Sequence, residues 1–380
     1  MSRRTAASVL AAAAAAAVLA GCTSTAPPKE EVAGGSGGPI KVAAADSSCD
    51  VATKEAPAGK ISFTVTNTGS KVTEFYLYAT GDRIMGEVEN IGPGLTRDLI
   101  VEVPDGGTYT TACKPGMVGD GIRAAFTVTG NAQRSVDQNT LLAEATAGYT
   151  RYVNSQIEAL VPKTEEFAAA VKAGDVAKAK ALFPVSRTYW ERIEPVAESF
   201  SDIDPKVDGR DDGEPGVAFT GYHRLEKDLW ESGLQPDSGA MADALVADMK
   251  DLQNRVKTLE LTPVQLANGA KELLDEVATG KITGEEDRYS HTDLWDFKAN
   301  VEGSQAAVAA LRPVIDEKDK ALGPLLDQRF AAVDTLLEQY RVGDGFTLYT
   351  ELTDEDKKKM TDAVDALSEP ISQVAAVVTS

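Results

Sequence analysis

Two hydrophobic periodicities divide this chain, and no single kind of secondary structure accommodates both. Between residues 40 and 130, apolar and polar side chains alternate, as at Ile61, Phe63 and Val65, and Gly-rich turns separate the short runs. This pattern is typical of strands that bury one face. After residue 130, apolar residues recur at three- and four-residue spacing, which indicates amphipathic helices. The chain is therefore predicted to fold as an all-β sandwich, residues 40–130, followed by an all-α helical bundle, residues 131–380.

The helical half contains three long stretches with this spacing, at residues 141–160, 241–259 and 314–340. At the usual length of a helix and its loop, about 240 residues hold roughly eight helices. Because proline breaks the hydrogen-bond pattern inside a helix, five prolines are expected where helices begin or end. They are Pro162, Pro184, Pro236, Pro263 and Pro313.

The N-terminus predicts export. In residues 1–21, two arginines precede an apolar run that is too short to span a bilayer, which is typical of a signal peptide. The run ends Leu-Ala-Gly before Cys22, which resembles a bacterial lipobox with Cys22 as the lipidation site; an ordinary signal peptide is the alternative. Residues 22–39 are rich in Gly, Ser and Pro and predict a flexible tether. We therefore expect a lipid-anchored protein on the periplasmic or extracellular face of the cell membrane.

The formal net charge is −21. So acidic a surface argues against nucleic acid and anionic lipid headgroups as partners, and it favours the attraction of cations. The simpler alternative is that most of the acidic residues only keep an exported protein soluble.

Residues 106–117, GGTYTTACKPGM, resemble the ligand loop of cupredoxins, with Cys113 and Met117 at the ligand positions. A blue-copper centre also needs two histidines. The only histidines of the chain, His223 and His291, belong to the helical half. Composition therefore excludes a blue-copper centre in the β domain.

A different metal site could form in the β domain. Cys49, Glu74 and Cys113 would supply two thiolates and a carboxylate, a set that could hold copper or another transition metal. Two cysteines in an exported domain also commonly form a disulfide. The sequence leaves both alternatives open.

Residues 221–230, GYHRLEKDLW, place His223 and Glu226 three residues apart in a predicted helix. Side chains at this spacing lie on one helical face and can share a ligand. The pair is the mirror image of the Glu-x-x-His arrangement of metal sites in helical bundles. Alone it is weak evidence, because a single histidine is more often a hydrogen-bonded core residue.

Three acidic segments strengthen the hypothesis of a metal site. Residues 190–198 place three glutamates on one predicted helical face, residues 202–216 form an acidic loop, and residues 288–297 bring aspartates beside the second histidine. Like charges so arranged repel one another unless a cation lies between them. The acidic residues of these segments include Glu191, Glu194, Glu198, Asp202, Asp204, Asp208, Asp293 and Asp296.

These segments resemble the imelysin family, whose mark is a Gly-x-His-x-x-Glu motif, present here from Gly221 to Glu226. A cupredoxin-like domain followed by an imelysin domain on an exported chain is similar to the EfeO-type iron-uptake lipoproteins. The resemblance implies that the α domain binds iron, ferrous or ferric, and that the β domain binds copper or iron. The implied α-domain ligands are His223, Glu226, Glu191, Glu194, Asp208 and Asp293, and the implied β-domain ligands are Cys49, Glu74 and Cys113.

The resemblance also implies an iron-binding component rather than an enzyme, although copper in the β domain could assist ferrous oxidation. The implied partners are an EfeU-type iron permease and an EfeB-type haem peroxidase. One alternative is a metallopeptidase, because imelysins have been classed with peptidases. Against it, Arg224 occupies the position of the general base in the zincin motif, and no second histidine follows. Another alternative is metal-dependent binding of acidic polysaccharide.

Overall fold

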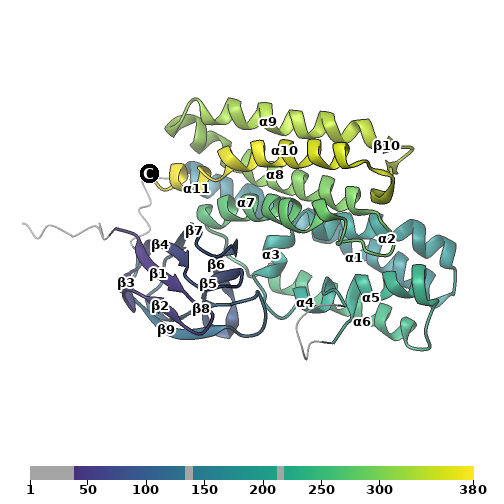
Figure 1. The fold of residues 1–380 in the computed structure, drawn as a ribbon, viewed down its shortest axis with the longest axis horizontal. Helices are drawn as coiled ribbons and strands as arrows, with labels where there is room; N and C mark the ends of the chain where they lie inside the picture. Colours follow the sequence, from purple (N-terminus) through teal and green to yellow (C-terminus); the bar gives the residue numbers. More distant parts are fainter. Residues whose placement is uncertain (1–37, 133–139, 212–217) are drawn as a thin grey trace, which may run out of the picture. The chain divides into compact units, whose positions relative to one another are not determined.

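The computed structural model describes residues 38–132, 140–211 and 218–380 (Figure 1). The predicted signal peptide, the lipidation site Cys22 and nearly all of the tether lie outside the described residues. Within the described ranges, no helix is both long enough and apolar enough to cross a membrane.

The β domain is a sandwich of two sheets, as the alternating pattern predicts. One sheet has the strand order β2-β1-β4-β7 and the other the order β3-β9-β8-β5-β6. The core between them contains the rings of Phe63, Phe75 and Phe126. The strands are β1 (Ile40–Ala44), β2 (Cys49–Val51), β3 (Glu55–Pro57), β4 (Gly59–Asn67), β5 (Thr73–Tyr78), β6 (Ile84–Ile91), β7 (Thr96–Val103), β8 (Gly107–Cys113) and β9 (Ile122–Thr129).

The rest of the described chain is helical, and the predicted order of a β-sandwich followed by helices is confirmed. In Figure 1, α7, α8, α9 and α10 lie alongside one another, and α1 packs against α2, α6 and α8. The helices are α1 (Thr140–Lys172), α2 (Val176–Glu191), α3 (Glu194–Glu198), α4 (Asp204–Val207), α5 (Gly221–Lys227), α6 (Ser238–Val256), α7 (Pro263–Thr279), α8 (Asp293–Lys318), α9 (Leu322–Leu337), α10 (Asp354–Ile371) and α11 (Val374–Val378). A short π-helical turn, Asp228–Ser232, follows α5, and the strand pair β10 (Arg341–Val342) and β11 (Gly345–Phe346) follows α9. Three 3₁₀ turns also occur in this half: η3 (Lys281–Thr283), η4 (Glu338–Tyr340) and η5 (Tyr349–Glu351).

The proline prediction is only partly correct. Pro263 begins α7 and Pro236 precedes α6, but Pro162, Pro184 and Pro313 lie inside helices α1, α2 and α8. An internal proline removes one backbone hydrogen bond, which long helices packed on several neighbours can tolerate. The predicted stretch 314–340 is also two helices, because α8 ends at Lys318 and α9 begins at Leu322.

The two sheets of the sandwich are joined by a disulfide between Cys49 in β2 and Cys113 in β8, 64 residues apart in sequence. A cross-link over this distance removes much conformational freedom from the unfolded chain.

We expect the double substitution Cys49→Ala/Cys113→Ala to lower the free energy of unfolding of the sandwich by about 2–4 kcal/mol. Denaturant titration followed by circular dichroism would measure the loss. Reduction of the wild-type protein should reproduce it, and an unchanged midpoint in both experiments would contradict the prediction.

Candidate metal centre

Gly221 determines how the motif helix meets the chain before it. Its φ is +73°, and a Cβ atom at this position would lie only 2.1 Å from the carbonyl oxygen of Val207. Only glycine allows both the left-handed backbone and this close approach. Because Val207 is the last residue of α4 and Asp208 is its C-cap, α5 begins directly beside Asp208. The glycine of the motif thus brings the first turn of α5, with His223, to that carboxylate.

His223 is buried, with 2% of its surface exposed. Its Nδ1 lies 3.0 Å from Glu226 Oε2, in hydrogen-bonding geometry. Its Nε2 lies 3.3 Å from Asp208 Oδ1 and 3.5 Å from Glu286 Oε1, and makes no hydrogen bond. One ring nitrogen is therefore oriented by a carboxylate while the other faces two carboxylate oxygens. This arrangement is typical of a metal-binding imidazole and the group that orients it.

Glu226 is held from the other side by the loop before α8. Its Oε1 accepts hydrogen bonds from the backbone N–H groups of Tyr289, at 3.0 Å, and Ser290, at 2.7 Å. Potential ligand atoms of His223, Glu226 and Asp287 all lie within 4.8 Å of one another. The predicted pair, His223 and Glu226, therefore lies together, and Asp287, which is outside the motif, lies beside it.

Glu191 and Glu194 lie on opposite sides of the break between α2 and α3. Glu191 Oε2 and Glu194 Oε2 both accept hydrogen bonds from Asn300 Nδ2, at 3.2 and 3.0 Å, and from Lys281 Nζ, at 2.6 and 2.9 Å. Both glutamates have potential ligand atoms within 4.8 Å of Asp208. The structure thus brings Glu191, Glu194 and Asp208 together, as the sequence predicts.

The third glutamate of that segment does not join them. The helix breaks after Glu191, so the predicted single face does not exist, and Glu198 instead lies near Glu87 of β6 and Glu272 of α7.

The second predicted segment contributes less directly. Asp293 accepts a hydrogen bond from the backbone N–H of Asp287, at 3.2 Å, and so supports that loop. His291 has a left-handed backbone, φ 60°, and contributes through its main chain, whose N–H donates to the carbonyl oxygen of Asp287 at 2.7 Å. Neither residue belongs to the clusters of potential ligands found among the described residues.

A buried arginine organises the carboxylates. Arg187, in α2, is fully buried and lies within ion-pair distance of five carboxylates from α2, the end of α4 and the region around α8. They are Glu191, Asp208, Glu286, Asp287 and Asp296. Since a guanidinium stays charged and presents several donors in fixed directions, Arg187 orients this set.

The sequence does not predict five members of this centre: Arg187, Lys281, Glu286, Asp287 and Asn300. The acidic run 285–287 could have been a signal, although acidic runs are usually solvated surface. Arg187 has a local partner in Glu191, but its other partners, like those of Lys281 and Asn300, lie on other elements of the fold, so the sequence gives no local signal for their place at the centre.

Burial and neighbouring charges divide the carboxylates into two groups. Burial raises the pKa of Asp208 and of Glu286, but nearby cations overcome it: Arg187 for Asp208 and Lys281 for Glu286, each aided by His223, hold both values well below the ordinary range. For Glu191 and Glu194 burial prevails and raises the pKa of each to about 8, with Lys281 opposing the shift. Burial likewise raises the pKa of Asp287 and Asp296 well above the usual value.

The pKa of His223 is also raised. Burial and the charge of Arg187 lower it, but interactions with Asp208, Glu226 and Glu286 leave it well above its ordinary value. Without a metal, the centre therefore binds protons that an incoming cation would replace.

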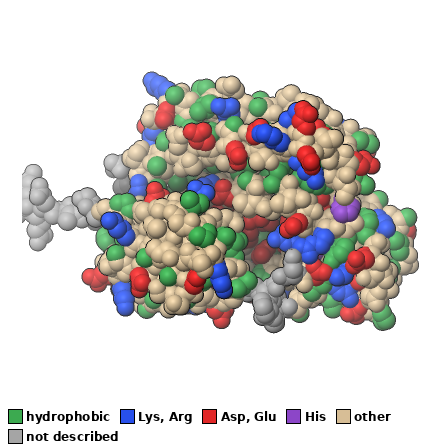
Figure 2. All heavy atoms as spheres, viewed as in Figure 1, with side chains coloured by type: hydrophobic (Ala, Val, Ile, Leu, Met, Phe, Trp, Pro, Cys, Tyr) green, Lys and Arg blue, Asp and Glu red, His purple; other side chains and the backbone are tan. Residues whose placement is uncertain are grey.

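A cavity of about 730 Å³ reaches the centre, and its lining is mainly acidic. Figure 2 shows acidic side chains within a hollow on this face of the molecule. The lining includes Glu194, Asp208 and Glu286 of the centre, together with Glu74 and Glu89 of the sandwich and Glu276 of α7. A cation entering this cavity would meet more acidic than basic side chains, the basic ones being Lys114, Arg210 and Arg288.

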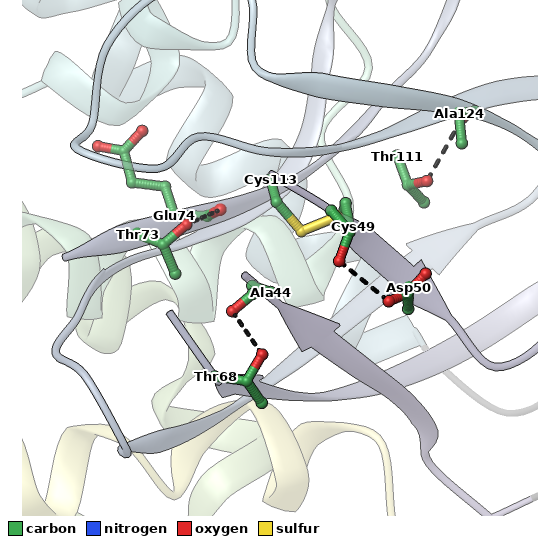
Figure 3. Close-up of a disulfide and its surroundings, with 10 residues drawn as sticks. Ala44, Cys49, Asp50, Thr68, Thr73, Glu74, Thr111, Cys113 and Ala124 are labelled. Carbon is green, nitrogen blue, oxygen red and sulfur yellow. Dashed lines mark hydrogen bonds between the residues drawn. A yellow bond between two sulfur atoms is a disulfide. The ribbon is translucent and has the colours of Figure 1, made fainter. Parts of the chain in front are cut away.

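The β domain does not assemble the predicted three-residue metal site in this structure. Cys49 and Cys113 form the disulfide, which is the alternative left open by the sequence, and the side chain of Glu74 extends away from the two sulfur atoms (Figure 3). The Glu74 carboxylate instead accepts a hydrogen bond from the Tyr76 hydroxyl, at 3.0 Å. A disulfide offers no thiolate, so these residues do not fit a copper ion.

Both domains of this chain match families of known proteins. The profile described as imelysin matches residues 145–374, and the profile described as a cupredoxin-like domain matches residues 10–128. The chain belongs to the imelysin family, with an EfeO-type domain organisation. It is 40% identical over 345 residues, 89% of this chain and 91% of the relative, to proteins named iron uptake system component EfeO from Escherichia coli strain K12 and Shigella flexneri.

Among solved structures, a quarter of this chain aligns with the whole of dithionite-reduced auracyanin from the photosynthetic bacterium Roseiflexus castenholzii, at 22% identity and a TM-score of 0.22. The family assignment does not depend on that match.

The role of Gly221 generates a prediction. We expect Gly221→Ala to weaken metal binding at least about tenfold, because the added methyl group would push α5 away from Asp208. Gly174→Ala is a matched control: Gly174 also has a positive φ, 71°, but nothing lies within 4 Å of the position that an alanine methyl group would occupy there. It should cost stability, about 1 kcal/mol, and leave the affinity unchanged. Equal affinities for both variants would contradict the role of Gly221.

The protons held by the centre predict the pH dependence of binding. His223, Glu191 and Glu194 all have raised pKa values, so a metal ion must displace protons below about pH 8. Affinity for ferrous ion under anaerobic conditions should rise at least about tenfold from pH 6 to pH 8. Calorimetry in buffers of different ionisation enthalpy would measure the protons released, and binding without proton release would contradict this assignment.

Proposed function

We propose that this chain is the iron-binding component of an EfeUOB-type uptake system, which captures iron outside the cytoplasm and passes it to a membrane permease. The observation that carries the proposal is His223 Nε2, which is buried, makes no hydrogen bond and faces Asp208 and Glu286. These carboxylates can pair with Nε2 only while the imidazole carries a proton there, and a metal ion would take the place of that proton. A metal ion is the ligand that fits between an imidazole nitrogen and two carboxylates.

The donor set supports iron as the cargo. One imidazole with several carboxylates suits iron, whereas calcium and magnesium prefer oxygen alone and soft metals prefer thiolates. The curated relatives are named as components of an iron uptake system, which agrees with this choice. With several carboxylates around His223, ferrous and ferric ions would both have oxygen ligands at this centre.

The partners and the location follow from the same resemblance. An EfeU-type permease would receive the ion and an EfeB-type haem peroxidase would act in the same system. The lipobox-like sequence at Cys22 would anchor the chain to the membrane that contains the permease.

The peptidase alternative finds no support at the motif. Arg224, which stands where a zincin has its general base, forms ion pairs with Asp228 and Asp237. An arginine does not abstract a proton from water near neutral pH. His291, the other histidine, is not in a ligand cluster with His223. Binding rather than hydrolysis is therefore the function that the geometry favours.

Substitution of the motif residues tests the proposal. We expect His223→Gln to weaken ferrous-ion binding at least about 100-fold, because it removes the only nitrogen ligand. Glu226→Gln should weaken binding about 10–100-fold, since Glu226 orients the ring. Anaerobic competition with a chromogenic chelator would measure both affinities.

His291→Asn is the matched control, since asparagine tolerates the left-handed backbone at this position. Its affinity should equal that of the wild type. If His223→Gln binds iron as tightly as the wild type does, the proposed function is wrong.

A further inference from the structure

Lys281 occupies the position between two of the candidate ligands. It is fully buried, and its ammonium group lies 2.6 Å from Glu191 Oε2 and 2.9 Å from Glu194 Oε2. Glu191, Glu194 and Asp208 also form a set whose potential ligand atoms lie within 4.8 Å of one another. A metal ion and the ammonium group would therefore compete for the same two carboxylates. Two cations at that distance in a buried site repel strongly, so both cannot stay.

Asn300, beside this pair, has a buried polar atom without a hydrogen-bond partner. The residue is fully buried, its Nδ2 donates to both glutamate carboxylates and to the main-chain oxygen of Glu191, and its Oδ1 has no partner. Rotation of the amide by about half a turn exchanges the two atoms, since the group is planar. Asn300 would then present an oxygen, which is a metal ligand, to the position that its nitrogen now faces.

We propose that the ammonium group of Lys281 is an internal cation that the metal ion displaces from the Glu191–Glu194 pair, so that Lys281 sets how tightly the centre holds its cargo. The inference rests on the proposed function. It assigns Lys281 a role in affinity and release rather than a place among the ligands.

The displaced ammonium group has other carboxylates to contact. Lys281 begins η3, directly after Gly280, and Gly284 follows this turn with a φ of 79°. Glu276 and Glu286 also attract the charge of Lys281, and both line the acidic cavity. The side chain can therefore exchange one carboxylate environment for another without entering the apolar core.

Arg187 differs from Lys281 in this respect. Its guanidinium contacts five carboxylates at once, whereas the Lys281 ammonium contacts two. Moving Arg187 would leave several buried charges without a partner, which is costly. The arginine therefore stays as the fixed counter-charge, and the lysine is the cation that exchanges with the metal.

This exchange favours ions of higher charge. A monovalent cation gains little by replacing an ammonium group of equal charge, whereas a divalent or trivalent ion interacts two or three times more strongly with the same carboxylates. The return of Lys281 to the pair also compensates the two carboxylates as the metal leaves. Competition from the Lys281 ammonium group would therefore help a protein of this kind to release its metal ion to a partner.

Lys281→Met tests the proposal, because methionine is unbranched and uncharged. We expect this variant to bind ferrous ion at least about tenfold more tightly than the wild type and to surrender it more slowly to a chelator. Lys281→Arg, which keeps the charge, should not bind more tightly. Lys271→Met is the matched control: Lys271 pairs with Asp275 on α7, outside the centre, and its loss should not change the affinity.

The metal-free Lys281→Met protein should be less stable than the wild type, since Glu191 and Glu194 lose their counter-charge. Added ferrous ion should then raise its unfolding temperature by more than it raises that of the wild type, a comparison that applies even if the metal-free variant is poorly folded. Equal or weaker binding by Lys281→Met, with an equal or smaller thermal shift, would overturn the inference. If His223→Gln still loses binding in that case, the proposed function stands; if His223→Gln binds normally, the proposed function fails instead.

Discussion

A fully buried arginine that contacts five carboxylates is the interaction on which the helical half depends. A guanidinium remains charged in any environment, so Arg187 can be buried only if carboxylates surround it. Residues far apart in sequence supply them, from Glu191 beside it in α2 to Asp296 in α8. These ion pairs fix the relative positions of α2, α4 and α8. The same contacts place Asp208 and Glu286 opposite His223, so the interaction that stabilises the interior also shapes the candidate metal centre.

Arg187 and Lys281 do not neutralise all of the carboxylates around them, and this imbalance is the physical basis of the proposed function. Asp208 and Glu286 have lowered pKa values, whereas burial raises the pKa values of Glu191, Glu194, Asp287 and Asp296, although these four also lie beside Arg187 or Lys281. Raised values mean that ionisation of these groups opposes folding: their contribution to stability is present at low pH and is lost as pH rises through the folded-state pKa. A multivalent cation removes this penalty. Ionisation of the buried carboxylates therefore costs free energy, and a bound metal ion would offset that cost.

The sequence predicts the local features of this protein well and the long-range features poorly. Periodicity separates the sandwich from the helices, and the spacing of His223 and Glu226 identifies the motif because both lie on one turn of α5. The resemblance to the imelysin family implied that Glu191, Glu194 and Asp208 converge, and the repulsion expected between the closely spaced glutamates supported it. Lys281 and Arg187 could not be inferred, because a basic residue among acidic ones is normally a surface ion pair. The prolines inside α1, α2 and α8 escape prediction for a related reason, since tertiary packing overrides a local preference.

The separation of roles between the two halves follows from where the nitrogen ligands lie. The described sandwich has no histidine, and its two cysteines are joined to each other, so the side chains that it places in the lining of the acidic cavity are Glu74 and Glu89, together with Lys114, Met117 and Val118. Under the proposed function, the two glutamates would attract a cation into the cavity without binding it through nitrogen. The helical centre would add an oriented imidazole, which suits iron better than oxygen ligands alone. Release of a cation from His223 would then require another cation, or protons, to take its place.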